Sequence, residues 1–406
     1  MSVAGVPALR FRDFEGVWEE RRLANIGRFK SGVGFPDIEQ GGTTGVPFLK
    51  VSDMNLAGNE HVMSRANHYV SDEQIGRLGY KVIQDRSIIF AKVGAAIFLE
   101  RKRQAEGFLI DNNMMAFIPS KEIAFDFCVQ KFSIIRLSKF AQVGALPSYN
   151  SSDIGIIKVA IPALPEQQKI ADFLGAADAR VGLLRRRRDA LRAYKKGMVQ
   201  RLFSQSLRFT KADGSPFPDW QEKRLGEVLT EHGERSSGAE RVHSVSVHKG
   251  VIDQIEHLGR SFSASNTDHY GLVKPGDVIY TKSPTGDFPF GIIKQSRLSI
   301  NVIVSPLYAV FTPKTKALGC ILNEHFLSVT NTHNYLHQLV QKGAKNTINV
   351  TNQGFLQGKL VLPIDPEEQQ KIACTLTALD AKIDAVTAQM DAMQRFKKGL
   401  LQQMFV

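Results

Sequence analysis

Glu166-Gln-Gln-Lys-Ile-Ala171 recurs as Glu368-Gln-Gln-Lys-Ile-Ala373, 202 residues further along the chain. The same offset relates Trp18-Glu-Glu-Arg-Arg-Leu23 to Trp220-Gln-Glu-Lys-Arg-Leu225, and these two segments hold both tryptophans of the chain. A third pair at this offset is Lys195-Lys-Gly197 and Lys397-Lys-Gly399. Three pairs at one offset indicate a tandem duplication, with a period too long for a solenoid or a propeller blade. We therefore expect two similar folds related by a pseudo-two-fold axis.

Each copy begins with a long stretch of mixed pattern, which predicts an α+β globular domain. Short apolar runs bounded by turn residues predict strands at 46–51, 87–90, 115–118, 278–280 and 302–311. Ser87-Ile-Ile-Phe-Ala-Lys92 in the first copy matches Asp277-Val-Ile-Tyr-Thr-Lys282 in the second. A helix is expected at 324–341, on the outside of the second domain.

Each copy ends in a segment whose apolar residues alternate three and four positions apart, the a/d pattern of a coiled coil. Pro165 and Pro366 stand where these segments begin, and a fixed φ is tolerated in the first turn of a helix. The expected interface consists of Ile170, Leu174, Val181, Leu184, Leu191, Met198, Ile372, Leu376, Leu379, Ile383, Val386, Met390, Met393 and Leu400. We expect an antiparallel coiled coil within the chain. The alternative is that each apolar stripe packs only on its own globular domain.

These patterns divide the chain into four segments. Globular domains are expected at 1–163 and 206–364, and helical segments at 164–205 and 365–406. Ala212-Asp-Gly-Ser-Pro-Phe-Pro218 has the composition of a linker. The expected fold class is α+β, with two globular domains joined by two long antiparallel helices in a pseudo-two-fold tandem repeat.

The chain has 406 residues and is basic, with 52 Lys+Arg, 40 Asp+Glu and a net charge of +12. Its hydrophobic fraction of 43% excludes a disordered or collagen-like chain, and three scattered cysteines exclude a disulfide framework. No signal-peptide pattern and no apolar run of ~20 residues occurs, so we expect a cytoplasmic protein that does not span a membrane. Half of the excess charge lies on 166–204, around Arg185-Arg-Arg-Arg188. This run indicates contact with phosphates or an acidic partner, or else a solvated helix face.

The motifs of common enzyme classes are absent. No GxxxxGK[ST], HExxH or GxSxG pattern occurs, nor do the two characteristic loops of amino-methyltransferases. Pro36-Asp37 and Glu100-Arg-Lys102 make a poor nuclease set, because they lie far apart and the second copy has no counterpart. His333 and His337 are spaced for one helix face, but no third metal ligand lies nearby. The sequence therefore predicts neither catalytic residues nor a metal site, and it favours binding over chemistry.

The framing motifs resemble the specificity subunit of type I restriction–modification enzymes. The resemblance rests on Leu164-Pro-Glu-Gln-Gln-Lys-Ile-Ala171 through Lys195-Lys-Gly-Met-Val-Gln-Arg-Leu-Phe203, and on Asp365-Pro-Glu-Glu-Gln-Gln-Lys-Ile-Ala373 through Lys397-Lys-Gly-Leu-Leu-Gln-Gln-Met-Phe405. It implies a non-catalytic subunit whose two target-recognition domains each read half of a bipartite site in double-stranded DNA, with the helices as spacer. It also implies two methyltransferase subunits and restriction subunits as partners. S-adenosylmethionine, ATP and Mg²⁺ would belong to those partners, and no cofactor to this chain.

Base reading needs polar side chains on loops that can reach a groove. Lys92 and Lys282 occupy matched positions after matched strands. The full set of expected DNA-binding residues is Lys92, Arg101, Lys102, Arg103, Ser148, Tyr149, Asn150, Lys282, Ser283, Thr285, Lys345 and Asn346. The alternative for each is an ordinary solvated loop residue. Because the two globular sequences diverge outside their framing motifs, we expect two different half-sites and an asymmetric target.

Two other functions stay open on the sequence. The chain could be the specificity subunit of a related type II system, or a coiled-coil interaction protein without DNA specificity. A single-chain nuclease or methyltransferase would have to act without partners, which the missing motifs argue against.

Overall fold

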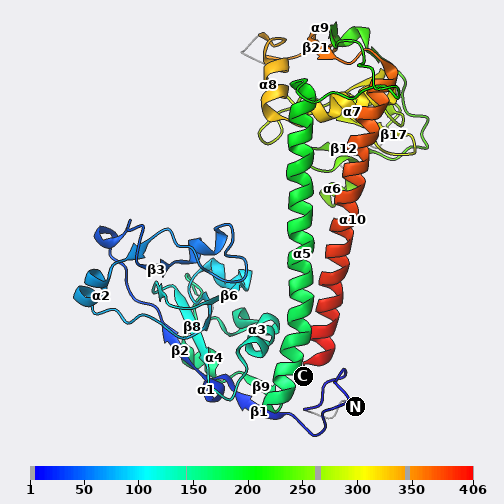
Figure 1. Cartoon of the computed structure of the whole chain (residues 1–406). Coiled ribbons are helices and arrows are strands. Elements are labelled where there is room, and N and C mark those ends of the chain that lie inside the picture. Colours follow the sequence, from blue (N-terminus) through cyan, green and yellow to red (C-terminus); the bar gives the residue numbers. More distant parts are fainter. Residues whose placement is uncertain (1–4, 143, 261–266, 343–347, 406) are drawn as a thin grey trace. The chain divides into compact units, whose positions relative to one another are not determined.

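The computed structural model describes residues 5–142, 144–260, 267–342 and 348–405. The chain divides into two compact units, one made of Met1–Arg185 with Ala388–Val406, the other of Arg186–Thr387. Each unit contains one globular domain together with part of each long helix, α5 (Leu164–Phe203) and α10 (Pro366–Met404), which are green and orange-red in Figure 1. Both predicted helical segments are thus found as continuous helices.

The first unit is built on a four-stranded antiparallel sheet with the order β2-β8-β5-β6. A second, three-stranded sheet has the order β4-β3-β7, and β1 pairs with β9 next to α5. The strands are β1 (Glu19–Arg22), β2 (Gly27–Ser31), β3 (Val46–Leu49), β4 (Tyr69–Val70), β5 (Ser87–Ala91), β6 (Lys102–Ala105), β7 (Leu109–Ile110), β8 (Met114–Pro119) and β9 (Lys158–Ile161). The helices are α1 (Leu23–Ile26), η1 (Asp37–Glu39), η2 (Val51–Asn55), α2 (Asp72–Leu78), η3 (Ala95–Leu99), α3 (Phe125–Ile134), η4 (Leu137–Phe140) and α4 (Ser151–Gly155).

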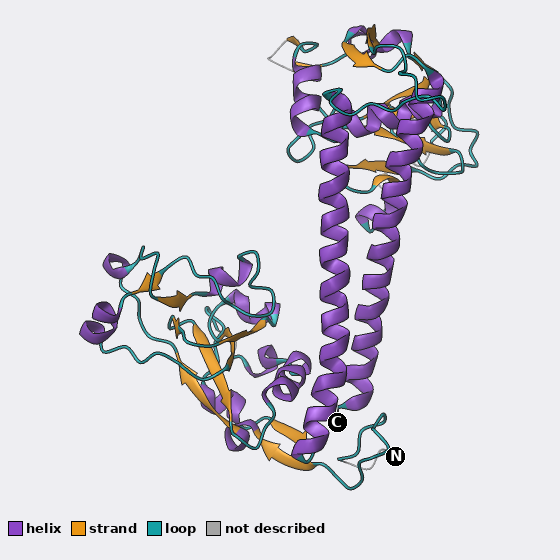
Figure 2. Ribbon diagram, in the orientation of Figure 1, coloured by secondary structure: helices purple, strands orange, loops and turns teal. Residues whose placement is uncertain are grey.

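The second unit repeats this plan, with a four-stranded antiparallel sheet in the order β11-β18-β15-β16 and a β10-β21 pair next to α10. Its strands are β10 (Gln221–Arg224), β11 (Leu229–Glu231), β12 (His243–Ser246), β13 (Gly250–Asp253), β14 (Gly271–Val273), β15 (Val278–Tyr280), β16 (Ile293–Gln295), β17 (Val302–Val304), β18 (Ala309–Pro313), β19 (Gln341–Lys342), β20 (Ile348–Asn349) and β21 (Lys359–Leu362). Its helices are η5 (Leu225–Glu227), α6 (Gln254–Leu258), α7 (Lys316–His325), α8 (Val329–His337) and α9 (Asn352–Gln357). Figure 2 distinguishes strands from helices by colour.

The central strands are buried on both faces, which explains their uninterrupted apolar sequences. In β5, Ile88 and Phe90 join the core against α3, while Ile89 joins a second core on the other face. In β15, Val278 and Tyr280 face one core and Ile279 the other. The same period of two therefore builds matched sheets in both units, as the duplication predicts.

Two predicted elements are wrong in extent. The run at 302–311 is two strands, β17 and β18, because the chain turns at 305–308, where the amide of Tyr308 donates to the carbonyl of Ser305. The expected helix at 324–341 is instead the end of α7 followed by α8. Ser328 ends the continuity because its side chain caps α8 by accepting from the amide of Asn331.

Within each unit, α5 and α10 pack against each other in antiparallel directions. In the first unit, Ile170 and Leu174 of α5 share a core with Leu400 and Met404 of α10. In the second, Leu202 of α5 shares a core with Ile372 of α10. These cores also contain the domain's own residues, so near the domains the apolar stripe packs on the partner helix and on the globular domain at once.

None of the helices in the described residues is long and apolar enough to cross a membrane.

Candidate nucleic-acid interface

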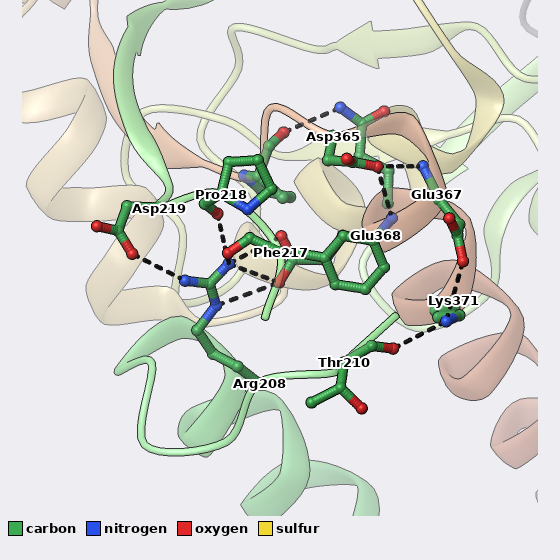
Figure 3. Close-up of polar contacts among 11 residues, drawn as sticks. Arg208, Thr210, Phe217, Pro218, Asp219, Asp365, Glu367, Glu368 and Lys371 are labelled. Carbon is green, nitrogen blue, oxygen red and sulfur yellow. Dashed lines mark hydrogen bonds and ion pairs between the residues drawn. The ribbon is translucent and has the colours of Figure 1, made fainter. Parts of the chain in front are cut away.

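The Glu-Gln-Gln motif joins each long helix to its domain through buried polar contacts. Glu368 accepts hydrogen bonds from the guanidinium of Arg208 at 3.1 Å, and Arg208 also contacts Asp219 and the carbonyl of Pro218 (Figure 3). In the first unit, Glu166 takes the same role with Arg10, at 2.7 Å. Both carboxylates are almost fully buried, so an unpaired one would be costly.

The neighbouring glutamines repeat this pattern. The side-chain amide of Gln167 donates to the carbonyl of Pro162, and that of Gln369 donates to the carbonyl of Pro363, both at 2.9 Å. Around the start of α10, Asp365 caps the helix by accepting from Glu367, while Lys371 pairs with Glu367 (Figure 3). The repeated motif is therefore a structural joint, and it does not form a ligand site.

Two ion pairs between α5 and α10 are exact counterparts in the duplication. Lys397 contacts Asp178 at 2.6 Å in the first unit, and Lys195 contacts Asp380 at 2.7 Å in the second. The residues expected at the helix interface are buried around them, except that Leu191, Met198 and Met393 are partly buried.

The second unit adds a further charge at this place. Glu324 of α7, almost fully buried, contacts Lys195 at 2.7 Å and Arg297 at 2.8 Å. The first unit has Gln130 of α3 near the corresponding helix pair, where its amide donates to Asp178 at 2.8 Å. At this place, the domain contacts the helix pair through the carboxylate of Glu324 in the second unit and through the side-chain amide of Gln130 in the first.

Several DNA-binding candidates of the first unit lie together beyond the end of β5. The amide of Tyr149 donates to the carbonyl of Lys92, and Ser148 forms a bridge with Val93. Asn150 is exposed but caps α4, since its side chain accepts from the amides of Ser152 and Asp153. Tyr149 itself is buried in the core and its hydroxyl donates to the carbonyl of Ala91 at 2.5 Å, so this side chain points away from any groove.

The basic run at 101–103 is divided between surface and interior. Lys102 is half-buried between Glu100, at 2.5 Å, and the carbonyl of Ile135, and burial lowers its pKa. Arg103 donates to the carbonyl of Asn59, and burial lowers its pKa as well. Among the described residues, Arg101 donates a hydrogen bond to the side chain of Asn55, at 2.6 Å, and to no other group, so it stays the most available of the three.

The candidates of the second unit occupy the matching hairpin loop, between β15 and β16. Lys282 has a left-handed backbone with φ of 60°, and burial lowers its pKa. Ser283 is exposed, and Thr285 closes a small turn by exchanging hydrogen bonds with Phe288. Lys345 and Asn346 lie outside the described residues.

The two hairpin loops hold equivalent places but expose different side chains. The loop between β5 and β6 exposes Phe98 and Leu99, which were not predicted as site residues because they end an apolar run typical of a core. The loop between β15 and β16 exposes Ser283 and Asp287, and it buries Phe288. Phe98 and Leu99 lie in the first hairpin's loop, which corresponds in strand order to the loop with Ser283 and Asp287 in the second.

The described residues contain no group of three or more His, Cys, Asp or Glu side chains that could hold a metal ion. His333 and His337 stack on each other at a centroid distance of 5.3 Å, and both contact the ring of Phe290. They act as packing residues of α8.

Residues 15–193 match the family model described as type I restriction modification DNA specificity domain. The chain is 23% identical over 269 residues to the type I restriction enzyme MjaX specificity subunit of Methanocaldococcus jannaschii, and 22% identical over 268 residues to the MjaVIII specificity subunit of the same organism. These matches cover 63% and 60% of this chain, and the chain spans about 60% of the length of each relative.

Two solved structures share the fold. The S subunit of the type I restriction–modification system from M. genitalium superposes with a TM-score of 0.60 at 12% identity, over 99% of both chains. A chain from a structure concerned with complex assembly and conformational transition of the type I R-M system gives a TM-score of 0.52 at 16% identity, over 95% of this chain and 97% of that one. The predicted fold class, α+β with two long helices packed together, is confirmed.

Proposed function

We propose that this chain is the non-catalytic subunit that directs a type I restriction–modification enzyme to its DNA sequence, since residues 15–193 match the model of that DNA specificity domain and curated specificity subunits are similar to the chain. One observation carries this proposal: the two units repeat the same sheet and helix joints, while the matched hairpin loops expose different side chains. A duplicated frame with divergent loops suits a protein that reads two different half-sites. The target is therefore bipartite and asymmetric.

Each globular domain contacts double-stranded DNA with the loop that follows its central strand. In the first unit, this surface includes Lys92, Arg101, Ser148 and Asn150. In the second unit, the DNA-contacting surface includes Lys282, Ser283 and Thr285. It also includes Lys345 and Asn346, which are predicted from the sequence. Cations hold the phosphates and polar or apolar tips reach base edges.

The partners of this subunit are two methyltransferase subunits, together with restriction subunits. Support for two copies of one partner comes from Tyr194 and Phe396, which occupy duplicated positions on α5 and α10 and are 59% and 54% exposed. Each precedes a pair of lysines of which the second, Lys196 or Lys398, is exposed. Identical partners require identical contacts, and a repeated exposed aromatic residue is such a contact.

Catalysis and cofactors belong to the partners in this proposal. The methyltransferase subunits bind S-adenosylmethionine, and the restriction subunits bind ATP and Mg²⁺. The complex works in the cytoplasm, where its DNA is.

The decisive experiment is footprinting of DNA by the full chain in complex with its methyltransferase subunit. Two protected patches separated by unprotected base pairs are expected. A complex that assembles but protects no preferred sequence would favour a coiled-coil interaction protein instead.

The stoichiometry of the complex tests the partner surfaces. Native mass spectrometry should find two methyltransferase subunits on the wild type and one on Tyr194→Ser or on Phe396→Ser. Leu183→Ser is the matched control, because Leu183 is 52% exposed on the same helix as Tyr194 but has no aromatic counterpart at the duplicated position. Two subunits on both aromatic variants would remove these surfaces from the proposal.

A further inference from the structure

Three large apolar side chains are exposed on two neighbouring loops of the first unit. Phe98 and Leu99 end the short helix η3 and are 59% and 56% exposed, and Leu146 is 63% exposed. Isolated exposed apolar residues are common, but several of them within one loop pair are often functional.

The turn that exposes Phe98 and Leu99 is held firmly. Glu100 follows them in the left-handed conformation, with φ of 52°, which is uncommon for a residue with a side chain. Its carboxylate accepts hydrogen bonds from the amides of Leu137 and Ser138, at 3.2 and 2.9 Å, and pairs with Lys102. An unfavourable backbone conformation fixed by several contacts points to a function for the residues it presents.

The second loop is fastened to the start of the same turn. The amide of Gly94, the residue before η3, donates to the carbonyl of Pro147 at 2.7 Å. The side chain of Leu146 lies against Gly94, within 3.8 Å of the place where a Cβ atom would stand. Leu146 therefore belongs to the same surface feature as Phe98 and Leu99, which we name the apolar tip.

Three cations without an ion-pair partner among the described residues lie on the segments that form or hold the apolar tip. Lys92 begins the loop, and Arg136 and Lys139 flank the two amides that hold Glu100. None of these three makes an ion pair with another described residue, and Glu100 is already neutralised by Lys102. An apolar surface with cations on its supporting segments is complementary to DNA, whose phosphates would meet the cations while bases meet the tip.

We propose that the apolar tip, Phe98, Leu99 and Leu146, reads thymine methyl groups in the half-site bound by the first unit. The 5-methyl group of thymine is the one apolar feature of the major groove, and Phe and aliphatic side chains are suited to contact it. This inference rests on the proposed function. The matching loop of the second unit exposes Ser283 and Asp287, so it reads its half-site by hydrogen bonds.

Selection from a random duplex library by the full chain, in complex with its methyltransferase subunit, tests the assignment. The wild type should select a bipartite sequence with thymines in one half. Phe98→Ser/Leu99→Ser should lose the preference in that half and keep the other half unchanged. Ile38→Ser is the matched control, because Ile38 is 91% exposed in the same unit but lies outside the apolar tip, and it should select the wild-type sequence.

A second measurement changes the DNA and not the protein. In the selected duplex, deoxyuridine in place of thymine removes only the methyl group. Each methyl group that the apolar tip buries should then change the wild-type dissociation constant by about fourfold, as expected for one buried carbon group. The same replacement should leave the double variant's affinity unchanged.

The possible failures are distinguishable. If the wild-type complex selects no bipartite sequence, the proposed function itself is wrong. A double variant that selects the wild-type sequence, with deoxyuridine tolerated at every position, overturns only the role of the apolar tip. A double variant that no longer binds the methyltransferase subunit would also overturn it, since the tip would then be a protein contact.

Discussion

Acid should weaken the second unit through one histidine at the end of α7. The ring of His325 lies 4.9 Å from that of Phe203 and 5.1 Å from that of Phe326, between centroids. Its Nδ1 is buried without a hydrogen-bond partner among the described residues. Burial lowers the pKa of His325 to about 4, because the charged ring would lose its hydration.

The size of the effect follows from proton linkage. In the unfolded chain, a histidine has a pKa of about 6.5. Below this pH the unfolded state therefore binds a proton that the folded state, with its lower pKa, does not bind. Stability from this residue is therefore complete above pH ~6.5 and is lost as the pH falls toward the folded value. With a folded pKa of about 4, the loss amounts to about 2 kcal/mol at pH 5 and about 3 kcal/mol at pH 4.

The two tryptophans allow each unit to be followed separately. Trp220 lies in the second unit with its ring centroid 6.0 Å from that of Phe203, and Trp18 lies in the first unit. In a Trp18→Phe background, urea unfolding of the full chain followed by Trp220 fluorescence at pH 7 and pH 5 gives the pH-dependent change in the free energy of unfolding. The variant His325→Phe, which keeps an aromatic ring at this position, should reduce that change by about 2 kcal/mol.

The reverse background is the control. With Trp220→Phe, Trp18 reports the first unit, where a lysine, Lys131, lies near the ring of Phe405 in the place that His325 occupies beside Phe203. His325→Phe should not alter the pH dependence seen by Trp18. An equal pH dependence of Trp220 unfolding with and without His325 would refute the reasoning, because the buried ring would then not be the group that resists protonation.

Three further changes separate structural from DNA-binding roles. Glu324→Ala should lower the free energy of unfolding of the second unit by about 1.5–3 kcal/mol, since Lys195 loses one of its two carboxylate partners and keeps Asp380, and urea unfolding followed by Trp220 would show it. Tyr149→Phe should cost about 1 kcal/mol of stability through the lost hydroxyl contact with Ala91 while DNA affinity stays the same; weaker binding in a gel shift would contradict this placement. Lys345→Ala should weaken DNA binding and lower the salt slope by about 1, and unchanged affinity with unchanged slope would remove it from the interface.

The fold was predictable where the sequence has a strong period. The helices α5 and α10 follow from their heptad stripes, and β15 coincides with its predicted range. The predictions fail where a single contact interrupts a continuous pattern. Ser328 begins α8 within one apparently helical run, and the turn at 305–308 divides one apolar run into two strands. Neither interruption changes the hydrophobic period of the sequence, so the period does not reveal it.

The site was less predictable because residue type does not reveal orientation. Tyr149 and Lys102 have the chemistry of DNA contacts, yet the fold uses both internally. Phe98 and Leu99 have the chemistry of a core, yet both are exposed, directly before the left-handed residue Glu100. Their roles depend on contacts with segments about 40 residues away, such as the amides of Leu137 and Ser138, which no local pattern reports.

The duplication separates two kinds of constraint on this chain. The contacts that the Glu-Gln-Gln motif makes between helix and domain are kept in chemical detail, as in Arg10 with Glu166 and Arg208 with Glu368. A change in one member of such a pair would leave a charge buried, and the cost would fall on the whole unit. The exposed tips of the hairpin loops, such as Phe98 and Leu99, carry no such penalty because they do not bury a charge. The residues at the loop tips can therefore change at little cost in stability, and divergence between the two tips is what reading two different half-sites would require.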